Sequence, residues 1–260
     1  RTPITFRSQP HVADTDDSEF YIISDNLCDS GVFGTSCIQT DQSQSSTWAI
    51  HRDYIIERNW LRIGATTGAT TVKCITVQGL RGTIRNNICD LSSPTNASAT
   101  RRGVEVDNQG THASQAEPDD IDIYYNTFFS SFAATTIGVI VTAGPTDTRV
   151  KNNLCWFDNA TNSTNVCLTD NGSGTDPANN STTAEARETD PLFDGSIAGA
   201  APTTWTEWRV GTGSYAATGG TATFPPSKVD ANQCSDTTAN VYRGAMIPRV
   251  NARCRGVAGP

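Results

Sequence analysis

The 260-residue sequence contains no run of about eighteen apolar residues, which argues against a transmembrane helix. It contains no CxxC pair and no cysteine and histidine spacing typical of zinc, so we expect no metal site of that type. No Ser-His-Asp or Cys-His phrase points to a nucleophilic enzyme. Positive charge is also scarce. With 19 Lys and Arg against 27 Asp and Glu, the net charge of -8 disfavours nucleic acid or an anionic membrane as the partner.

Helical periodicity is missing as well. No segment of about twelve or more residues has apolar residues three and four apart, and Thr, Ser, Asn and Gly fill the intervals. A helical repeat is therefore disfavoured. No secretory signal peptide begins at Arg1, so we expect a processed product or a piece of a longer polypeptide.

What the sequence does contain is a short phrase that occurs five times. A β-branched residue and two further residues precede an asparagine, and an apolar pair follows it. The asparagines are separated by 33, 28, 39 and 27 residues, a range typical of stacked structural repeats. Only the fourth copy breaks the apolar pair, with Thr127. The five asparagines are Asn26, Asn59, Asn87, Asn126 and Asn153.

Each phrase suits a strand, a corner and a second strand. β-branched residues favour strands, and asparagine tolerates left-handed backbone conformations, so we expect the asparagine at the corner. If each phrase belongs to one coil, the coils lie about 4.8 Å apart and the asparagine amides form a ladder. We assign these asparagines no chemistry. The pattern predicts an all-β chain folded as a parallel β-helix.

A second apolar strand precedes each phrase from the second copy onward, and its alternate residues should point inward. These strands are Trp48–His51, Cys74–Gln78, Gly103–Asp107 and Gly138–Thr142. The predicted organisation is an irregular lead-in over 1–19, coils over 20–157, a polar loop or flexible tract over 158–188, and a C-terminal β segment over 189–260 that completes or caps the stack.

The lead-in contains no recognisable cap, although an open end of stacked strands exposes unpaired backbone groups. We therefore expect the N-terminal end to be covered by an upstream fragment, whether missing or cleaved and still bound, or by another subunit in a homo-oligomer.

The even number of cysteines indicates disulfides, and the simplest pairing is sequential. That pairing is Cys28 with Cys37, Cys74 with Cys89, Cys155 with Cys167 and Cys234 with Cys254. The alternative is buried thiols in a reducing compartment, because Cys28, Cys89 and Cys155 share one position in the repeat. N-x-S/T triplets, such as those at Asn96 and Asn171, are in keeping with an extracellular protein.

The repeated Ile-x-x-Asn phrase, preceded by Gly-Val-x-Val strands, resembles the right-handed parallel β-helix of the pectin-lyase-like superfamily. The C-terminal succession of short phrases resembles the segment that often ends such proteins. These phrases are Asp190–Phe193, Trp208–Val210, Gly213–Ala216, Asp230 and Arg243–Ala245. The resemblance covers roughly residues 20–250 and implies a right-handed parallel β-helix. It does not imply one activity, because the superfamily includes lyases, hydrolases, phage tailspikes and non-catalytic surface proteins.

Family motifs for catalysis are absent. The paired-aspartate and Gly-His-Gly motifs of polygalacturonase-like hydrolases do not occur, and Asp119-Asp120 has no histidine partner in phrase. The arginine-centred signature of pectate lyases is not recognisable either. Any catalytic site must therefore be inferred from the predicted positions of side chains.

Alignment of the strands that precede each phrase predicts one mixed-charge strip. Lys73 lies beside Arg102, and Glu105 lies beside Thr76 and Ile140. An outward ladder is expected to contain His51, Gln78, Asp107 and Thr142. Such an elongated face suits an extended polysaccharide.

The candidate catalytic residues are Lys73, Arg102, Glu105 and Asp107. In β-elimination, Lys73 and Arg102 would neutralise a uronate and supply a base, whereas Glu105 and Asp107 would bind Ca²⁺ with the substrate or act as an acid and base in hydrolysis. The alternative interpretation is a solvated strip with a cross-strand salt bridge.

His51, Gln78 and His112 are the candidate substrate-binding residues, and His112 lies in a long loop expected to overhang the groove. No cofactor is required by this chemistry, although Ca²⁺ would fit it. The predicted function is an extracellular, cell-surface or virion-borne polysaccharide-recognising protein, with lyase or hydrolase activity as one possibility. The alternative is a non-catalytic structural or adhesive module of a surface fibre, filament or viral particle.

Overall fold

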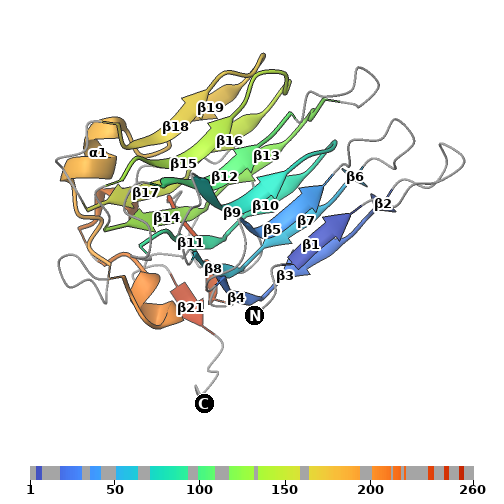
Figure 1. Cartoon of the computed structure of the whole chain (residues 1–260). Helices are drawn as coiled ribbons and strands as arrows, with labels where there is room; N and C mark the ends of the chain where they lie inside the picture. Colours follow the sequence, from blue (N-terminus) through green and yellow to red (C-terminus); the bar gives the residue numbers. More distant parts are fainter. Residues whose placement is uncertain are drawn as a thin grey trace, which may run out of the picture.

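The computed structural model describes residues 4–7, 18–30, 36–41, 51–63, 71–92, 99–108, 117–131, 134–158, 164–193, 201–211, 213–217, 220, 234–236, 243–245 and 252–254. Figure 1 shows a stack of strands, with the first strands in blue at one end and a short helix at the other. The predicted all-β class is confirmed over these residues.

Three parallel sheets form the stack. Sheet 1 contains β1 (Ile4–Arg7), β5 (Ser36–Asp41), β9 (Thr71–Val77), β12 (Thr100–Val106), β15 (Thr136–Val141) and β18 (Val166–Asp170). Sheet 2 contains β3 (Ile22–Ser24), β7 (Ile55–Glu57), β10 (Thr83–Arg85), β13 (Asp122–Tyr124), β16 (Arg149–Lys151) and β19 (Asp176–Ala178). Sheet 3 contains β4 (Leu27–Ser30), β8 (Trp60–Ile63), β11 (Ile88–Asp90), β14 (Thr127–Ser130) and β17 (Leu154–Phe157).

The remaining elements are small. The pairs are β2 (Ser18–Glu19) with β6 (His51–Arg52), parallel, and β20 (Cys234–Asp236) with β21 (Ala252–Cys254), antiparallel. The helices are α1 (Thr183–Glu188) and the 3-10 helices η1 (Trp205–Trp208) and η2 (Tyr215–Ala217).

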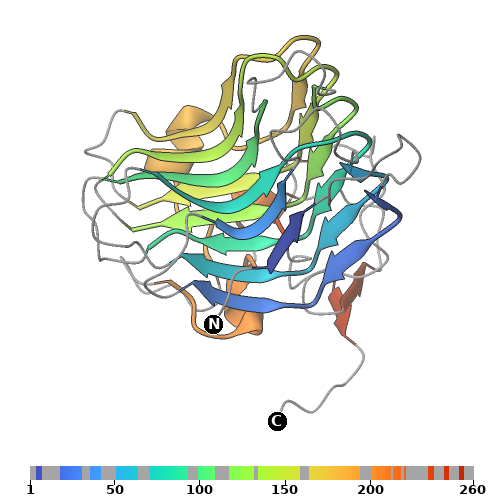
Figure 2. The same ribbon diagram turned by 45° about the vertical axis from the view of Figure 1, so that its right-hand side comes forward.

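The chain passes through sheets 1, 2 and 3 in turn, and we call each such passage a coil. The first coil is β1, β3 and β4, and the second is β5, β7 and β8. Every later coil adds its strands to the same edge of each sheet, so the three sheets grow together, as Figure 2 shows from a second side. The first coil begins at β1, so the predicted irregular lead-in over 1–19 is wrong for residues 4–7.

The predicted asparagine ladder runs through the stack between sheets 2 and 3. In each coil the backbone N–H and the side-chain amide of the asparagine donate to Oδ1 of the asparagine in the next coil. Asn87, for example, donates both to Asn126 Oδ1 at 3.0 Å. The amide also donates to a carbonyl of the preceding coil, as Asn126 does to Ile84 at 3.0 Å. The ladder thus satisfies buried polar groups at the corner.

The left-handed residue at this corner is not the ladder asparagine, as the sequence suggested, but the residue before it. Six such residues have φ between 52° and 58°: Asp25, Arg58, Asn86, Tyr125, Asn152 and Asn179. A second corner lies five residues earlier, with φ between 48° and 69° at Phe20, Asp53, Arg81, Asp120, Asp147 and Gly174. The ladder asparagine keeps its place through side-chain hydrogen bonds instead.

The interior is an apolar column lined by all three sheets. Ile75, Val77, Val104 and Val106 point inward from sheet 1, as predicted, and each is fully buried. Gly103 of sheet 1 faces the ring of Phe128, and a Cβ at Gly103 would lie 2.2 Å from that ring. The glycine therefore leaves the space that the phenylalanine fills.

A sixth coil occupies most of the stretch predicted to be a polar loop or flexible tract over 158–188. It consists of β18, β19 and α1, and Asn180 adds a sixth rung to the ladder. The repeated phrase is hard to see here because Pro177 replaces the β-branched residue and Ser181-Thr182 replace the apolar pair. Thr182 and Glu185 form a capping box, which explains why a helix starts where the other coils have a sheet 3 strand.

The C-terminal segment packs on the outer face of sheet 3. Its residues Phe193, Trp208, Val210, Ala216 and Ala245 form a buried cluster. The cluster includes Trp60, Ile88, Phe129, Leu154 and Trp156 of sheet 3. The segment thus covers the side of the stack rather than continuing it.

Thr127, the exception in the repeated phrase, has a place in this packing. Its Oγ1 accepts the backbone N–H of Ala245 at 2.8 Å. The neighbouring Gly244 N–H donates to the carbonyl of Asn152 at 2.9 Å, and Gly244 has a φ of 95°. A Cβ at Gly244 would lie 2.8 Å from Thr127 Oγ1, so this close approach requires glycine.

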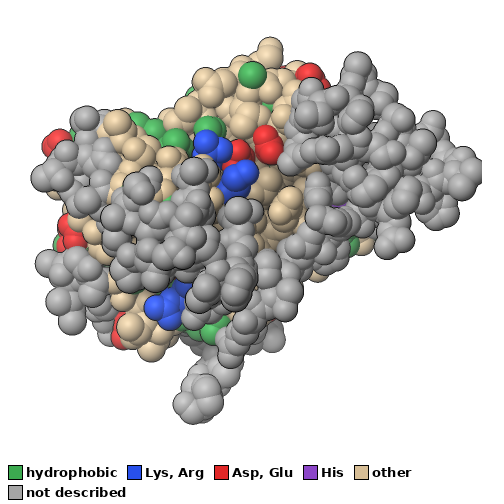
Figure 3. All heavy atoms as spheres, in the orientation of Figure 1, with side chains coloured by type: hydrophobic (Ala, Val, Ile, Leu, Met, Phe, Trp, Pro, Cys, Tyr) green, Lys and Arg blue, Asp and Glu red, His purple; other side chains and the backbone are tan. Residues whose placement is uncertain are grey.

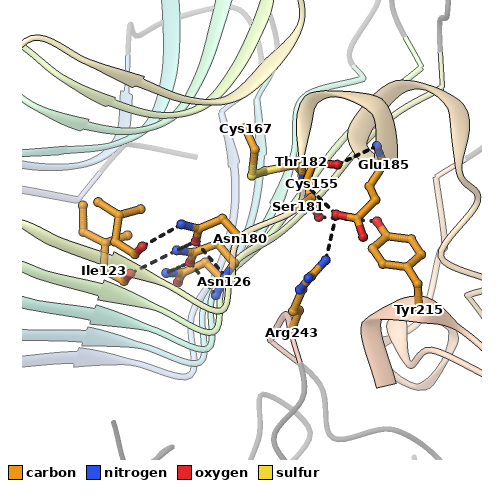
Figure 4. Close-up of a disulfide and its surroundings, with 12 residues drawn as sticks. Ile123, Asn126, Cys155, Cys167, Asn180, Ser181, Thr182, Glu185, Tyr215 and Arg243 are labelled. Atoms are coloured by element: carbon orange, nitrogen blue, oxygen red, sulfur yellow. Dashed lines mark hydrogen bonds and ion pairs between the residues drawn. A yellow bond between two sulfur atoms is a disulfide. The ribbon is translucent and has the colours of Figure 1, made fainter. Parts of the chain in front are cut away.

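The cysteines follow the predicted pairing only in part. Cys155 and Cys167 form a disulfide that joins the fifth and sixth coils, with 5.5 Å between their Cα atoms (Figure 4). The predicted bonds Cys28–Cys37 and Cys74–Cys89 are wrong, because all four are buried thiols. The thiols of Cys37 and Cys74 face backbone carbonyls of sheet 3 instead. Cys234 and Cys254 are opposite one another in the β20–β21 pair, and their side chains lie outside the described residues.

Candidate functional site

The predicted strip on the outer face of sheet 1 has the expected register. Arg102 pairs with Lys73, and Glu105 pairs with Thr76 and Ile140. Basic and acidic side chains lie close together over the strands of sheet 1 in Figure 3. Lys73, Arg102 and Glu105 are therefore brought together by β9 and β12.

These three side chains form an ion triad. Lys73 Nζ lies 2.6 Å from Glu105 Oε2, and Arg102 lies 2.5 Å from Glu105 Oε1. The Glu105 side chain is only 3% exposed, whereas Lys73 and Arg102 are partly exposed. Removing a carboxylate from water is costly unless cations compensate it, so the two basic residues stabilise Glu105 in place.

In the triad, Lys73 and Arg102 are both paired with Glu105, and a role for them in β-elimination stays a prediction. An ammonium that binds a carboxylate has no lone pair with which to accept a proton from carbon. A uronate would also have to displace Glu105 from both cations. The cross-strand salt bridge considered for this strip is therefore the arrangement observed, and its carboxylate is buried rather than solvated.

The expected outward ladder is wrong for two of its members. Gln78 is 2% exposed, and His51 is 1% exposed with its ring edge-on to Tyr21. His51 belongs to β6 because the sheet 1 strand that precedes the second phrase is β5, earlier in the chain than the predicted Trp48–His51 strand. Asp107 follows β12 and is half-buried, and His112 lies outside the described residues.

A second candidate site lies at the corner that precedes sheet 2. An open hollow of about 430 Å³ is lined by residues of the fourth, fifth and sixth coils. The lining residues are Asp119, Asp120, Asp147, Arg149, Gly174 and Asp176, and we call this hollow the corner pocket. Asp120, Asp147 and Gly174 are the left-handed residues of the same corner in successive coils.

Hydrogen bonds fix the walls of the corner pocket. Arg149 lies 2.5 Å from both Asp120 and Asp122, and its hydrogen bond to Asp122 is the main reason that its pKa is raised. Asp119 accepts the hydroxyl of Thr146 at 2.6 Å, and Lys151 binds Asp176. Asp147 is exposed at the rim.

The charge of the corner pocket is acidic. Four aspartates and one arginine line it, so it favours neutral or positively charged groups over a uronate. Carboxylates accept hydrogen bonds from hydroxyl and ammonium groups, and the guanidinium of Arg149 can donate one. This set of groups suits sugar hydroxyls.

Comparison of the chain with protein-family models, curated proteins and solved structures found no match. In the described part of the chain, no helix has the length and apolar character needed to cross a membrane.

No group of three or more His, Cys, Asp or Glu side chains is arranged to hold a metal ion within the described ranges. Calcium binding by Glu105 and Asp107 stays a prediction of the sequence. The corner pocket was missed because its residues precede the repeated phrase. Counting back six residues from the second to the fifth ladder asparagine gives Asp53, Arg81, Asp120 and Asp147, a column of charged residues that was the available signal.

Proposed function

We propose that this chain is a right-handed parallel β-helix protein, of the pectin-lyase-like kind, that recognises a polysaccharide outside the cell or on a virion. Support for the handedness is general, because crossovers between parallel strands are right-handed in nearly all proteins. The Cys155–Cys167 disulfide supports an oxidising location.

The observation that carries polysaccharide recognition is the corner pocket. It repeats one corner over three successive coils, and Asp120 and Asp147 place carboxylates at this corner in neighbouring coils, which are spaced by roughly 4.8 Å. An extended glycan presents hydroxyl groups at regular intervals, and exposed carboxylates can accept hydrogen bonds from them. The acidic lining favours a neutral or amino sugar.

The test is binding to immobilised neutral, amino and uronate polysaccharides, with Asp147→Asn as the pocket variant. Asparagine tolerates the left-handed conformation at this position, so the backbone should be unchanged. We expect binding to a neutral or amino polysaccharide and a loss of roughly tenfold in affinity when the charged acceptor is removed.

Asp53→Asn is the matched control, because Asp53 occupies the same corner in the second coil and lies outside the pocket. Its affinity should equal that of the unmodified chain. Retention of uronates alone, no retention of any polysaccharide, or an equal loss in both variants would each contradict the proposed site.

The ion triad on sheet 1 provides a second control. If Lys73 stabilises Glu105 and takes no part in recognition, Lys73→Met lowers the melting temperature and leaves polysaccharide affinity unchanged. Formation of an unsaturated uronate product that is lost in Lys73→Met would instead support the lyase activity predicted for this strip.

A further inference from the structure

Among the described residues, the first coil exposes large apolar side chains that the later coils do not. Phe20, Ile22 and Leu27 are 80%, 62% and 50% exposed. Phe20 and Ile22 lie at the beginning of sheet 2, and Leu27 begins sheet 3. At the position of Leu27 the second coil has Trp60, which is only 5% exposed. The first coil therefore has apolar residues like those of an interior coil, although it lies at the outer edge of the stack.

The asparagine ladder ends at this edge with an acceptor that none of the described residues uses. Asn26 donates its backbone N–H and its amide to Asn59 Oδ1 at 3.1 and 2.9 Å. In each later coil, Oδ1 of the ladder asparagine accepts the same two hydrogen bonds from the coil before it. No described residue donates to Asn26 Oδ1. An N–H pair on a partner at this edge would bind Asn26 Oδ1 as the preceding coil does at every later rung.

The charged residues at this edge indicate which residue a partner would have opposite Asp25. Asp25 precedes Asn26, and its side chain is 41% exposed although Arg58 of the second coil binds it at 2.9 Å. Arg58 occupies the same position of its coil and is the basic neighbour of Asp25 in this column, whereas the later coils have uncharged residues there. A coil placed before the first would complement Asp25 with a basic residue.

A second copy of the chain does not meet these requirements. Two N-terminal edges would bring the Asn26 Oδ1 acceptors and the Asp25 carboxylates together. If the C-terminal end of one copy met the N-terminal edge of another, Asn180 of the first could donate to Asn26 of the second. The Asp176 N–H could not take part, because it donates to the carbonyl of Thr148 in the fifth coil. Neighbouring residues of a strand point their N–H groups to opposite sides, so position 177 faces outward, and Pro177 has no N–H to donate.

We propose that the N-terminal edge binds an extended segment of a different polypeptide, which adds parallel strands to β3 and β4. The segment has an asparagine opposite Asn26, a basic residue opposite Asp25 and apolar residues that cover Ile22 and Leu27. This is addition of a strand to an open sheet edge, with side-chain pockets giving specificity. The inference is independent of polysaccharide recognition.

The probe is a labelled peptide with the sequence of residues 53–63, DYIIERNWLRI, which contains each of these features. Fluorescence anisotropy with the full chain should show saturable binding. The peptide with Asn59→Asp should bind at least tenfold more weakly, because the carboxylate replaces the donating amide and repels Asn26 Oδ1. The peptide with Arg58→Glu should also bind more weakly, because it places a like charge opposite Asp25.

Ile22→Lys in the chain should abolish peptide binding, and Leu192→Lys is its control. Leu192 is 46% exposed and lies beyond the sixth coil, so its replacement should leave binding unchanged. Sedimentation velocity of the chain alone tests whether two copies form a dimer. Absence of binding, equal binding of all three peptides, or a dimer that Ile22→Lys dissociates would overturn the proposal.

Discussion

The two ends of the stack are finished in different ways. At the C-terminal end, α1 replaces a strand, Pro177 lies in the edge strand, and a disulfide joins the last two coils. Glu185 of α1 binds Arg243 of the C-terminal segment at 2.8 Å (Figure 4). At the N-terminal end, β3 and β4 end the stack with exposed Ile22 and Leu27.

Edge strands attract further strands, and proteins protect them with proline, charge or a covering element. The C-terminal end has all of these, and the first coil has none of them over its described residues except Asp25. Over the described residues, the stack is therefore closed at its C-terminal end and open at its N-terminal end. The following experiments weaken one end or the middle and compare the effects.

The largest effect should come from a buried rung of the ladder. Asn126→Ala removes the acceptor of two Asn87 donors and the donor to the Ile84 carbonyl, while Asn153 Oδ1 keeps only the backbone N–H of residue 126. The free energy of unfolding should therefore fall by roughly 3 kcal/mol. Asn26→Ala at the open end should cost only about 1 kcal/mol. Equal costs in urea denaturation would mean that the first rung is as buried as the fourth.

The disulfide should give the next largest effect. Cys155–Cys167 closes a loop with a sequence separation of 12 residues, and its reduction should lower the free energy of unfolding by about 3 kcal/mol at most. Dithiothreitol should therefore lower the melting temperature of the chain. The double variant Cys155→Ala and Cys167→Ala should lose this response, and any shift that remains belongs to Cys234 and Cys254, which lie opposite one another in the β20–β21 pair.

Attachment of the C-terminal segment depends on Gly244. Gly244→Ala should lower the free energy of unfolding by about 2 kcal/mol, because it combines a positive φ with a close contact to Thr127. Gly213→Ala separates the two causes, since Gly213 has a φ of 89° but nothing within 4 Å of the added Cβ. If calorimetry gives the same melting temperature for both variants, the contact contributes nothing.

The smallest effect on stability should come from Asp90, the last residue of β11 in sheet 3. Burial raises the pKa of Asp90 above 3.8, and the hydrogen bonds from Ser92 and then the charge of Arg62, 3.4 Å away, offset this only in part. A carboxyl group whose pKa is higher in the folded than in the unfolded chain stabilises the fold at pH values below its unfolded pKa. This contribution is lost as the pH rises through its folded pKa. Asp90→Asn should therefore be more stable than the unmodified chain at neutral pH, and the difference should vanish below about pH 3.8.

Asp53→Asn is the control of opposite sign. Hydrogen bonds from Arg81 lower the pKa of Asp53 in the folded chain. Asp53 therefore stabilises the fold at pH values above its unfolded pKa, and this stabilisation is lost as the pH falls through its folded pKa. Melting temperatures from acidic to neutral pH should show the two variants changing in opposite directions. A parallel change would contradict these assignments.

Much of the fold was predictable because the repeated phrase encodes it locally. β-branched residues at fixed positions before each asparagine gave the strands of sheet 2, and alternation gave the inward face of sheet 1. The register of Lys73 with Arg102 followed directly. The sixth coil was not predictable in this way, because Pro177 and Ser181 break the phrase and only backbone pairing and Asn180 preserve it.

Other features depend on contacts between distant parts of the chain. The burial of Trp60 against Trp208 and the role of Thr127 follow from a C-terminal segment that no local pattern places on sheet 3. The position of His51 depends on a long excursion between β5 and β6. The corner pocket needs three coils in register, so its residues are apart in the sequence and together only in space.

The two left-handed corners have a consequence for evolution. Every coil keeps the same number of residues between them, whereas the distance from one ladder asparagine to the next varies from 27 to 39 residues. Length differences are therefore confined to connections outside the corners and sheet 2. A gene for such a chain can gain or lose a whole unit of 27 residues by duplication or deletion, and the neighbouring units still fit one another.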